Sequence, residues 1–193
     1  MRHDLSIAVV CSSNQNRSME AHHLLSKKGF RTKSYGTGSK VKLPGPTVDK
    51  PNVYDFNTPY EQIAEDLRNK DMSFYTQNGL LNMLDRNKRI KGKPEKFQRC
   101  NEEFDLIVTC QERVFDQVLE YMNDREQVSM NLVHVVNVEI RDNHEEATLG
   151  SFIIYDLVEK LSNTEDPASD IDTVIDFLEK KRNKRFLHSV AFY

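Results

Sequence analysis

Residues 6–29 read SIAVVCSSNQNRSMEAHHLLSKKG, and this stretch decides the fold because a strand, a polar loop and a helix follow one another. The apolar run SIAVVC (6–11) has the length of a buried strand and stops where small polar residues begin. MEAHHLLSKKG (19–29) then places apolar residues at near-helical spacing, with two lysines in the last turn and Gly29 as its cap. The next segment, FRTKSYGTG (30–38), alternates like a strand and ends at glycines. This order predicts two parallel strands joined by a right-handed crossover.

The rest of the chain continues this alternation after one interruption. Residues 39–59 carry four prolines and a glycine where the next helix of an α/β repeat would lie, so we expect an inserted loop or short hairpin. Helices are predicted at 60–71, 74–91, 111–124, 148–161 and 169–184, and further strands at 104–110, 133–140 and 185–193. The sequence therefore predicts a three-layer, doubly wound α/β fold of flavodoxin type, with a mostly parallel five-stranded sheet.

Length and composition limit the class of protein. The 193 residues, 38% hydrophobic and 30% charged, fit a single soluble domain over 1–193. A formal net charge of -3 does not favour nucleic acid or an anionic membrane as the main partner. No segment approaches the roughly 20 apolar residues of a membrane helix, and the N-terminus lacks the apolar run of a signal peptide. We therefore expect an intracellular protein.

The three cysteines are Cys11, Cys100 and Cys110, and none stands in CxxC spacing. This pattern predicts free thiols in a reducing compartment rather than a disulfide framework or a zinc site. We expect no metal site and no cofactor. Cys100 and Cys110 are interpreted as structural, which leaves Cys11 as the candidate nucleophile.

The junction between the first strand and the first helix is predicted to be an anion-binding site. Ligands of open α/β sheets bind beyond the carboxyl ends of the strands, where Cys11 lies. The loop that follows consists of small or turn-tolerant residues, so its successive N–H groups can curl inward around an anion. These loop residues are Ser12, Ser13, Asn14, Gln15 and Asn16. The helix N-terminus and the planar guanidinium of Arg17 add positive charge suited to a phosphate.

The positive charge of the helix N-terminus and of Arg17 also acts on the thiol of Cys11. Cysteines at helix N-termini beside cations commonly ionise near neutral pH, and a thiolate that faces a bound phosphate is a phosphoryl acceptor. The hydroxyl of Ser18 could donate a hydrogen bond to the sulfur of Cys11 and keep it anionic. A buried, structural cysteine is the common alternative for a cysteine at a strand end. The combination of strand, loop and helix around Cys11 favours the catalytic interpretation.

A cysteine-dependent phosphatase also needs a general acid that later serves as a base. Asp142 is the best candidate by position, because it directly follows the strand at 133–140 and shares the carboxyl edge with Cys11. An N-cap or loop aspartate is an equally consistent interpretation of its position. The neighbouring His144 has no metal-ligand spacing around it.

Longer blocks of sequence carry a family resemblance. The chain resembles the SSU-type phosphatase family, which acts on the C-terminal domain of RNA polymerase II, from about residue 6 to the final FLHSVAFY. The blocks that carry it are VVCSSNQNRSMEAH (9–22), GTGSKVKLPGPTVDKPNVYDF (36–56), YTQNG (75–79), MLDRNKRIK (83–91) and VNVEIRDNHEEATLG (136–150). These blocks are far more specific than the C-x5-R-S core, which many phosphatases share.

The resemblance implies a fold like that of low-molecular-weight tyrosine phosphatases, with cap elements inserted at about 39–92. It places the nucleophile on Cys11, the phosphate-binding arginine on Arg17, the thiolate-stabilising hydroxyl on Ser18 and the general acid on Asp142. The implied substrate is phosphoserine before a cis proline in the polymerase heptad repeat, mainly at the fifth position and secondarily at the seventh. The residues implied to line the peptide groove are Lys42, Leu43, Pro44, Pro46, Tyr75 and Met83.

The resemblance also implies partners and a compartment. Symplekin and the cleavage and polyadenylation factors would be its protein partners, with a function in transcription and mRNA 3′-end processing, in the nucleus and also in the cytoplasm. The residues themselves agree in one respect, because an apolar, proline-rich insert beside an anion cradle suits a phosphorylated peptide that contains proline. A cis-specific enzyme acts on a minor population, so we expect a functional link to a prolyl isomerase. No direct contact with nucleic acid or membrane is expected.

Two other functions fit the motif. One is a tyrosine phosphatase or an arsenate reductase on the same fold, although a reductase would need further cysteines close to Cys11. The other is a scaffold that grips phosphopeptides without turnover.

Overall fold

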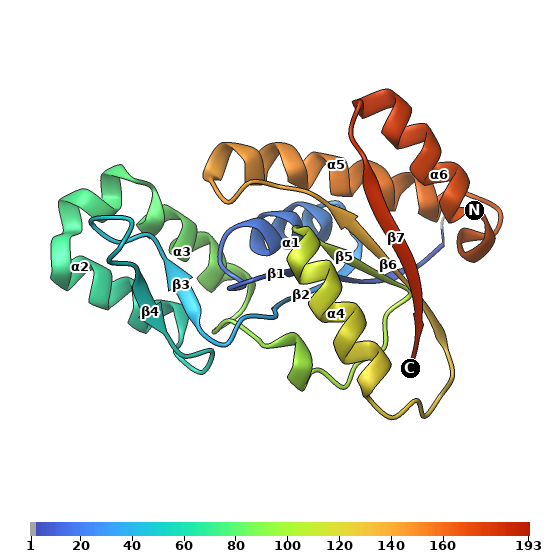
Figure 1. Ribbon diagram of the computed structural model, residues 1–193. Helices are drawn as coiled ribbons and strands as arrows, with labels where there is room; N and C mark the ends of the chain where they lie inside the picture. The colour runs from blue at the N-terminus through green and yellow to red at the C-terminus, as the bar shows by residue number, and fades with distance from the viewer. Residues whose placement is uncertain (1–2) are drawn as a thin grey trace.

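The computed structural model describes residues 3–193 and contains a five-stranded sheet in the order β2-β1-β5-β6-β7 (Figure 1). Its strands are β1 (Ser6–Cys11), β2 (Arg31–Gly36), β5 (Leu106–Thr109), β6 (Leu132–Val138) and β7 (Phe186–Phe192). The first four strands run parallel and β7 is antiparallel to β6, so the predicted mostly parallel sheet is confirmed. The strand order is that of the flavodoxin type.

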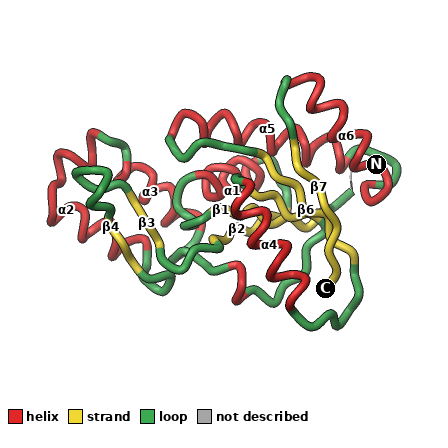
Figure 2. The backbone as a smooth tube through the Cα atoms, viewed as in Figure 1, coloured by secondary structure: helices red, strands yellow, loops and turns green. Residues whose placement is uncertain are grey.

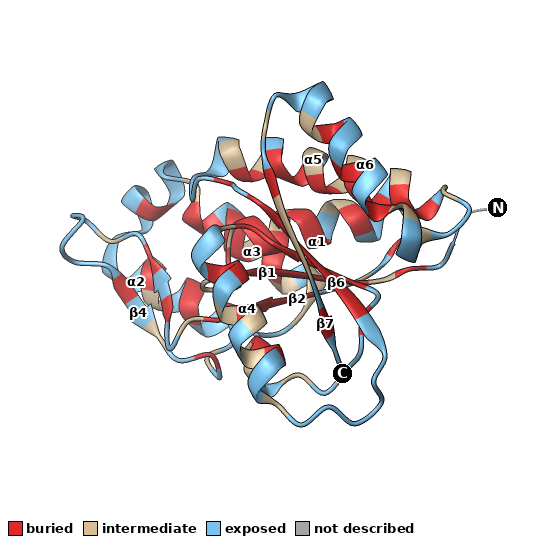
Figure 3. Ribbon diagram, turned by 45° about the vertical axis from the view of Figure 1, so that its right-hand side comes forward, coloured by how far each residue is buried: buried red, intermediate tan, exposed pale blue. Residues whose placement is uncertain are grey.

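Helices cover both faces of this sheet, which gives the predicted three layers (Figures 1 and 2). They are α1 (Arg17–Lys27), α4 (Glu112–Asp124), α5 (His144–Ser162) and α6 (Pro167–Arg182). The side chains of β1 alternate between the two faces, as a strand requires. Ile7 and Val9 pack with α1, α5 and α6, whereas Ala8 and Val10 pack with α4. Figure 3 shows the buried residues gathered in the sheet and on the helix faces turned toward it.

The segment inserted after β2 forms a separate cap with its own apolar core (Figure 2). It consists of the antiparallel pair β3 (Val41–Leu43) and β4 (Asn52–Tyr54) and the helices α2 (Tyr60–Gln77) and α3 (Leu80–Ile90). The prediction of a short hairpin within 39–59 is thus confirmed. Met19 of α1 belongs to the cap core, so the cap packs directly on the helix that follows Cys11.

The predicted single helix at 74–91 is wrong. Asn78 and Gly79 separate α2 from α3, because Gly79 has a left-handed φ of 82° and the Asn78 side chain accepts a hydrogen bond from the N–H of Leu80 (3.1 Å). The predicted end of the preceding helix at residue 71 is confirmed as a break in the backbone. Asp71 is non-helical, with φ of -165° and ψ of 90°, and it divides the span of α2, which continues to Gln77.

Helix α5 begins at His144, four residues before the predicted start at 148. Asn143 is its N-cap, and the Asn143 side chain accepts a hydrogen bond from the N–H of Glu146 (2.9 Å). Glu145 and Glu146 lie in the first turn, where carboxylates stabilise the positive end of the helix dipole. None of the helices described here is both long and apolar enough to cross a membrane.

Candidate active site

The candidate site lies where the direction of strand order reverses in the sheet. The chain runs from β1 through α1 to β2 on one side, and β5 pairs with β1 on the other side. The carboxyl end of β1 is therefore at the switch point where ligands bind in open α/β sheets. Cys11 is the last residue of β1, and α1 begins six residues later at Arg17. A cavity of about 230 Å³ at this point is lined by Cys11, Arg17 and Asp142 together with residues of the cap.

Hydrogen bonds hold the carbonyl groups of the loop from its outer side. The first of these bonds come from the residues that follow β2. The N–H of Thr37 donates to the oxygen of Cys11 (3.0 Å) and the N–H of Gly38 to that of Ser12 (2.9 Å). Position 36 must be glycine because the loop leaves no room for a side chain there. A Cβ at this position would lie 2.7 Å from the carbonyl oxygen of Ser12, closer than packing allows.

The cap holds the next two carbonyls. The hydroxyl of Tyr60 donates to the oxygen of Asn14 (2.6 Å), and the side-chain amide of Asn87 and the guanidinium of Arg86 donate to the oxygen of Gln15 (2.9 Å each). Because four carbonyls point away from the centre of the loop, the intervening N–H groups are left for its concave side. This is the backbone arrangement of an anion nest.

Asn14 is the strained residue of the loop, with a left-handed φ of 53°. Its buried side chain compensates by donating to the hydroxyl oxygens of Ser18 (3.0 Å) and Ser34 (3.2 Å) and by accepting from the N–H of Glu95 (2.9 Å). Asparagine tolerates this region of backbone space better than other residues with a side chain. The side chain of Asn14 is therefore a structural brace of the loop, and the loop amides are its anion-binding groups.

The sulfur of Cys11 lies 3.1 Å from the hydroxyl oxygen of Ser18. The Ser18 oxygen already accepts from Asn14, so its own proton is free to donate to the sulfur, as the sequence predicted. The chain of polar contacts continues from Asn14 to Ser34, and the hydroxyl of Ser34 lies 2.8 Å from Nδ1 of His22. Burial, followed by the positive charge of Lys91, lowers the pKa of His22 to about 4, so this histidine is neutral at pH 7.

Arg17 is buried at 5% exposure, and protein groups orient its guanidinium. Its NH1 donates to the carbonyl oxygen of Ile140 (3.0 Å) and to Gln111 (3.2 Å), and its NH2 donates to the hydroxyl of Ser12 (3.2 Å). The buried Nε2 of Gln15 has no hydrogen-bond partner within residues 3–193, and the buried Nε of Arg17 makes no hydrogen bond there but lies 3.5 Å from the carboxylate of Asp142. A buried donor without a partner is costly, so Nε2 of Gln15 favours a bound anion in the cavity.

Asp142 lies in the loop between β6 and α5, with its side chain 62% exposed. Its carboxylate accepts from the side-chain amide of Asn16 (3.0 Å) and lies 3.5 Å from Nε of Arg17. The structure thus brings Asp142 to the same cavity as Cys11. The N-cap of α5 is Asn143, so the alternative assignment of Asp142 as the N-cap is wrong.

The cap side of this cavity is an apolar groove beside the loop of residues 11–17, which we call the cradle. Lys42, Leu43, Pro44 and Met83, which the family resemblance places at the peptide groove, line this cavity together with Cys11. Asn78, Gly79 and Leu80 also line it, and these were missed because the Asn-Gly turn signal was assigned to a continuous helix.

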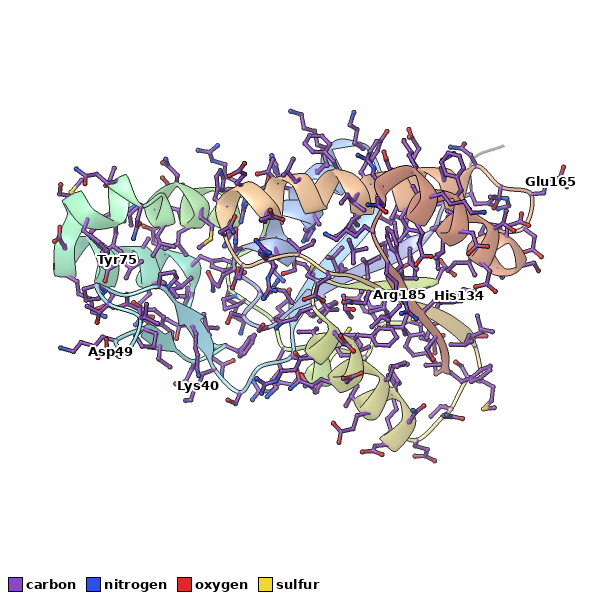
Figure 4. The ribbon with its side chains drawn as sticks, turned by 45° about the horizontal axis from the view of Figure 1, so that its top comes forward. Lys40, Asp49, Tyr75, His134, Glu165 and Arg185 are labelled. Atoms are coloured by element: carbon purple, nitrogen blue, oxygen red, sulfur yellow. The ribbon has the colours of Figure 1, made fainter. Side chains whose placement is uncertain are left out.

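The structure does not bring two of the expected groove residues into this lining. Tyr75 is 3% exposed inside the cap core, where its hydroxyl accepts from the side chain of Asn52 (2.9 Å; Figure 4). Pro46 lies in the exposed turn between β3 and β4.

The other two thiols lie apart from the cradle surface. Cys110, at the end of β5, is fully buried, and burial raises the pKa of its thiol. Cys100 is half-buried, and its sulfur lies 3.2 Å from the hydroxyl of Tyr35. Within residues 3–193, histidine, cysteine and carboxylate side chains form no group of three or more that could hold a metal ion.

Comparisons with known proteins agree over nearly the whole chain. The family model for Ssu72-like proteins matches residues 5–193. The RNA polymerase II C-terminal domain phosphatase SSU72 of Danio rerio is 60% identical over 191 residues, which cover 99% of this chain and 98% of that protein. The protein of the same name from Homo sapiens is 61% identical over 189 residues, which cover 98% and 97%.

Two solved structures are also similar over nearly the whole chain. The crystal structure of D. melanogaster Ssu72 with Symplekin, bound to a cis peptidomimetic CTD peptide phosphorylated on the fifth-position serine, superposes with a TM-score of 0.96 at 54% identity. The superposition covers 98% of this chain and 99% of that chain. A second D. melanogaster structure, described as the serine phosphatase of the RNA polymerase II CTD, gives a TM-score of 0.96 at 56% identity and covers 98% and 100%.

Proposed function

Because this chain belongs to the Ssu72 family, we propose that it is a cysteine-dependent protein serine phosphatase of the RNA polymerase II C-terminal domain. The substrate is a phosphoserine followed by proline in the heptad repeat, mainly at the fifth position and secondarily at the seventh. One observation supports this proposal above the others. The thiol of Cys11 lies in a cavity whose donors are arranged for a phosphate and whose neighbouring wall is apolar.

The first step of the proposed reaction transfers the phosphoryl group to sulfur. The loop amides and Arg17 hold the phosphate oxygens while the thiolate of Cys11 attacks phosphorus. The bond between phosphorus and the serine oxygen breaks, and Asp142 donates a proton to that oxygen. The products of this step are the free serine side chain and a phosphocysteine.

The second step restores the enzyme. The carboxylate of Asp142 accepts a proton from a water molecule that attacks phosphorus, and the bond between phosphorus and sulfur breaks. Inorganic phosphate leaves and Cys11 returns to the thiolate, which the hydroxyl of Ser18 stabilises. Asp142 is well placed to change roles because its side chain is largely exposed and water can reach it.

The groove supports a peptide substrate that contains proline. Leu43, Pro44, Leu80 and Met83 offer an apolar surface beside the cradle, and a proline ring that follows the phosphoserine would pack against it. The D. melanogaster relative binds a cis peptidomimetic, and we propose the same cis requirement for this protein. Only about 10–30% of X–Pro bonds in a disordered chain are cis, so we expect a prolyl isomerase to accelerate dephosphorylation when enzyme is in excess. Identical time courses with and without isomerase would rule this link out.

The proposed setting is nuclear, in transcription and mRNA 3′-end processing. The D. melanogaster relative crystallised with Symplekin, and we propose symplekin and the cleavage and polyadenylation factors as partners of this protein. A cytoplasmic pool is part of the same proposal.

The test compares phosphate release from peptides by the wild type and by Cys11→Ser. The peptides carry one phosphate on the fifth-position serine, the seventh-position serine or a tyrosine. We expect release from the phosphoserine-proline peptide by the wild type alone, while Cys11→Ser still binds that peptide. Turnover by Cys11→Ser would refute the cysteine mechanism, and faster hydrolysis of phosphotyrosine would assign the protein to the tyrosine phosphatases.

A further inference from the structure

A second, larger groove of about 840 Å³ adjoins the candidate active site. It extends from the cradle over the residues that follow β2, the first turn of α4 and the loop after β6. Ser13, Arg17, Lys42 and Asp142 line both this groove and the catalytic cavity, so the two are continuous. The cradle is therefore continuous with both the apolar groove and this second groove, which we call the basic groove.

The lining of the basic groove is strongly cationic. Six of its lining residues are arginine or lysine and two are carboxylates. The cations are Arg17, Lys40, Lys42, Lys96, Arg113 and Arg141. Both carboxylates already have partners, because Glu139 accepts from the N–H of Glu112 (2.8 Å) and from Asn137 (3.1 Å), and Asp142 contacts Asn16 and Arg17. The chain as a whole carries a net charge of -3, so this concentration of positive charge is local.

Most of these cations lack a counter-ion. Lys40 pairs with Asp55, and Arg17 is held beside Asp142. The side chains of Lys96, Arg113 and Arg141 make no hydrogen bond or ion pair with any residue in 3–193. Unpaired cations that surround a concave surface attract an anion more strongly than isolated surface charges do, because their fields add within the groove. The arginine fork is well suited to phosphate oxygens.

The two grooves also set the direction in which the peptide chain runs through the site. Under the proposed function, the proline after the reacting phosphoserine occupies the apolar groove, so the residues before the phosphoserine continue into the basic groove. We propose, on the basis of that function, that the basic groove binds a second phosphate of the same peptide, N-terminal to the reacting phosphoserine. An extended chain advances about 3.3–3.6 Å per residue, so a phosphate two to four residues away lies about 7–14 Å from the reacting phosphate. The groove makes the enzyme selective for doubly phosphorylated peptides.

The experiment measures kcat/KM for three peptides of one sequence. The first carries only the reacting phosphoserine before proline. The second and third carry an added phosphoserine three residues toward the N-terminus or three residues toward the C-terminus. The readout is the ratio of kcat/KM for each doubly phosphorylated peptide to that for the first peptide, which cancels any general change in activity.

For the wild type we expect a ratio of about three to ten for the N-terminal phosphate, carried by KM. The ratio for the C-terminal phosphate should stay near one. Raising the ionic strength from about 0.05 M to about 0.5 M should reduce the N-terminal ratio toward one, because salt screens exposed charges.

The double variant K96Q/R113Q should bring the N-terminal ratio close to one. The matched control K27Q/K180Q removes the same charge elsewhere and should keep the wild-type ratio. Lys27 and Lys180 lie in the last turns of α1 and α6, and neither lines the basic groove. A circular dichroism melt of both variants verifies that each is folded.

Two outcomes overturn the inference without touching the proposed function. The first is efficient hydrolysis of the singly phosphorylated peptide with no gain from the N-terminal phosphate. The second is an undiminished gain in K96Q/R113Q. If single-stranded RNA binds the wild type but not K96Q/R113Q while the second phosphate has no effect, the groove is a nucleic-acid site and the inference is wrong. Failure of the wild type on the singly phosphorylated peptide refutes the proposed function instead.

Discussion

Tyr60→Phe tests whether the cap holds the phosphate-binding loop in shape. The hydroxyl of Tyr60 donates to the carbonyl oxygen of Asn14 at 2.6 Å, and both residues are fully buried. Phenylalanine fills the same space but leaves this oxygen without a donor, and water cannot reach it. An unsatisfied buried polar group costs about 1–3 kcal/mol. Asn14 has a left-handed φ of 53°, so the lost bond also releases a strained residue.

We expect a loss of about 1–3 kcal/mol in the free energy of unfolding, measured by urea denaturation. We also expect weaker competitive inhibition by vanadate and a fall of about tenfold in kcat/KM. A loop that is no longer held in place stabilises the transition state less, and a loss of about 1.4 kcal/mol in that stabilisation lowers the rate tenfold. Burial raises the pKa of Tyr60 well above that of a free phenol. The hydroxyl therefore stays protonated across the working range, and the loss should not depend on pH between about 6 and 9.

Tyr54→Phe is the matched control in the same cap. Its hydroxyl donates to Asp66 at 2.6 Å, but Asp66 is partly exposed and also pairs with Lys70, so water and the lysine replace the lost bond. We expect its stability to change by less than about 0.5 kcal/mol and its kcat/KM to stay at the wild-type value. The reasoning is refuted if Tyr60→Phe is as stable and as active as Tyr54→Phe.

Three further predictions follow from other contacts. His22 has a folded pKa of about 4 and an ordinary value of 6.5, so the unfolded chain takes up a proton first as pH falls. Its contribution to the free energy of unfolding should decline by up to about 3 kcal/mol between pH 7 and 4, and His22→Gln should flatten that slope in urea titrations at several pH values. Gly150→Ala places a Cβ 2.3 Å from Cδ1 of Ile140, whose carbonyl orients Arg17. This overpacking should cost about 1–3 kcal/mol in urea denaturation, whereas Gly92→Ala, with nothing within 4 Å, should cost less than about 1 kcal/mol. Asp142→Asn should lower kcat on a phosphoserine peptide by about 10²–10⁴. It should lower kcat on an aryl phosphate far less, because an aryl leaving group needs no proton, and equal losses on both substrates would contradict the role of general acid.

Local sequence patterns were sufficient to predict the sheet and the loop after Cys11. The apolar run at 6–11, the small polar residues after it and Arg17 are all close in sequence, so their geometry follows from a strand that passes into a helix. The alternation of apolar and polar residues predicted the layers, because each strand and helix must bury one face. Asp142 could be placed at the carboxyl edge of the sheet because parallel strands end at the same edge.

The signals that failed are those in which two local patterns compete. Leucines at helical spacing suggested one helix over 74–91, and the Asn-Gly pair within it was overlooked. Gly79 adopts a positive φ and turns the chain there, which places Leu80 and Met83 at the groove. A single glycine outweighed the periodicity because its backbone reaches a region that other residues avoid.

The sequence by itself determined the sheet, the cradle and the position of its thiol, since these depend on residues that are neighbours along the chain. Only the tertiary structure decided how the cradle is held and what surrounds it. Tyr60, Arg86 and Asn87 hold loop carbonyls that lie 46 to 72 residues away, and Lys96 meets Arg113 and Arg141 only at the basic groove. Contacts over such separations depend on how the cap and the loops pack, and no period or motif in the chain encodes them.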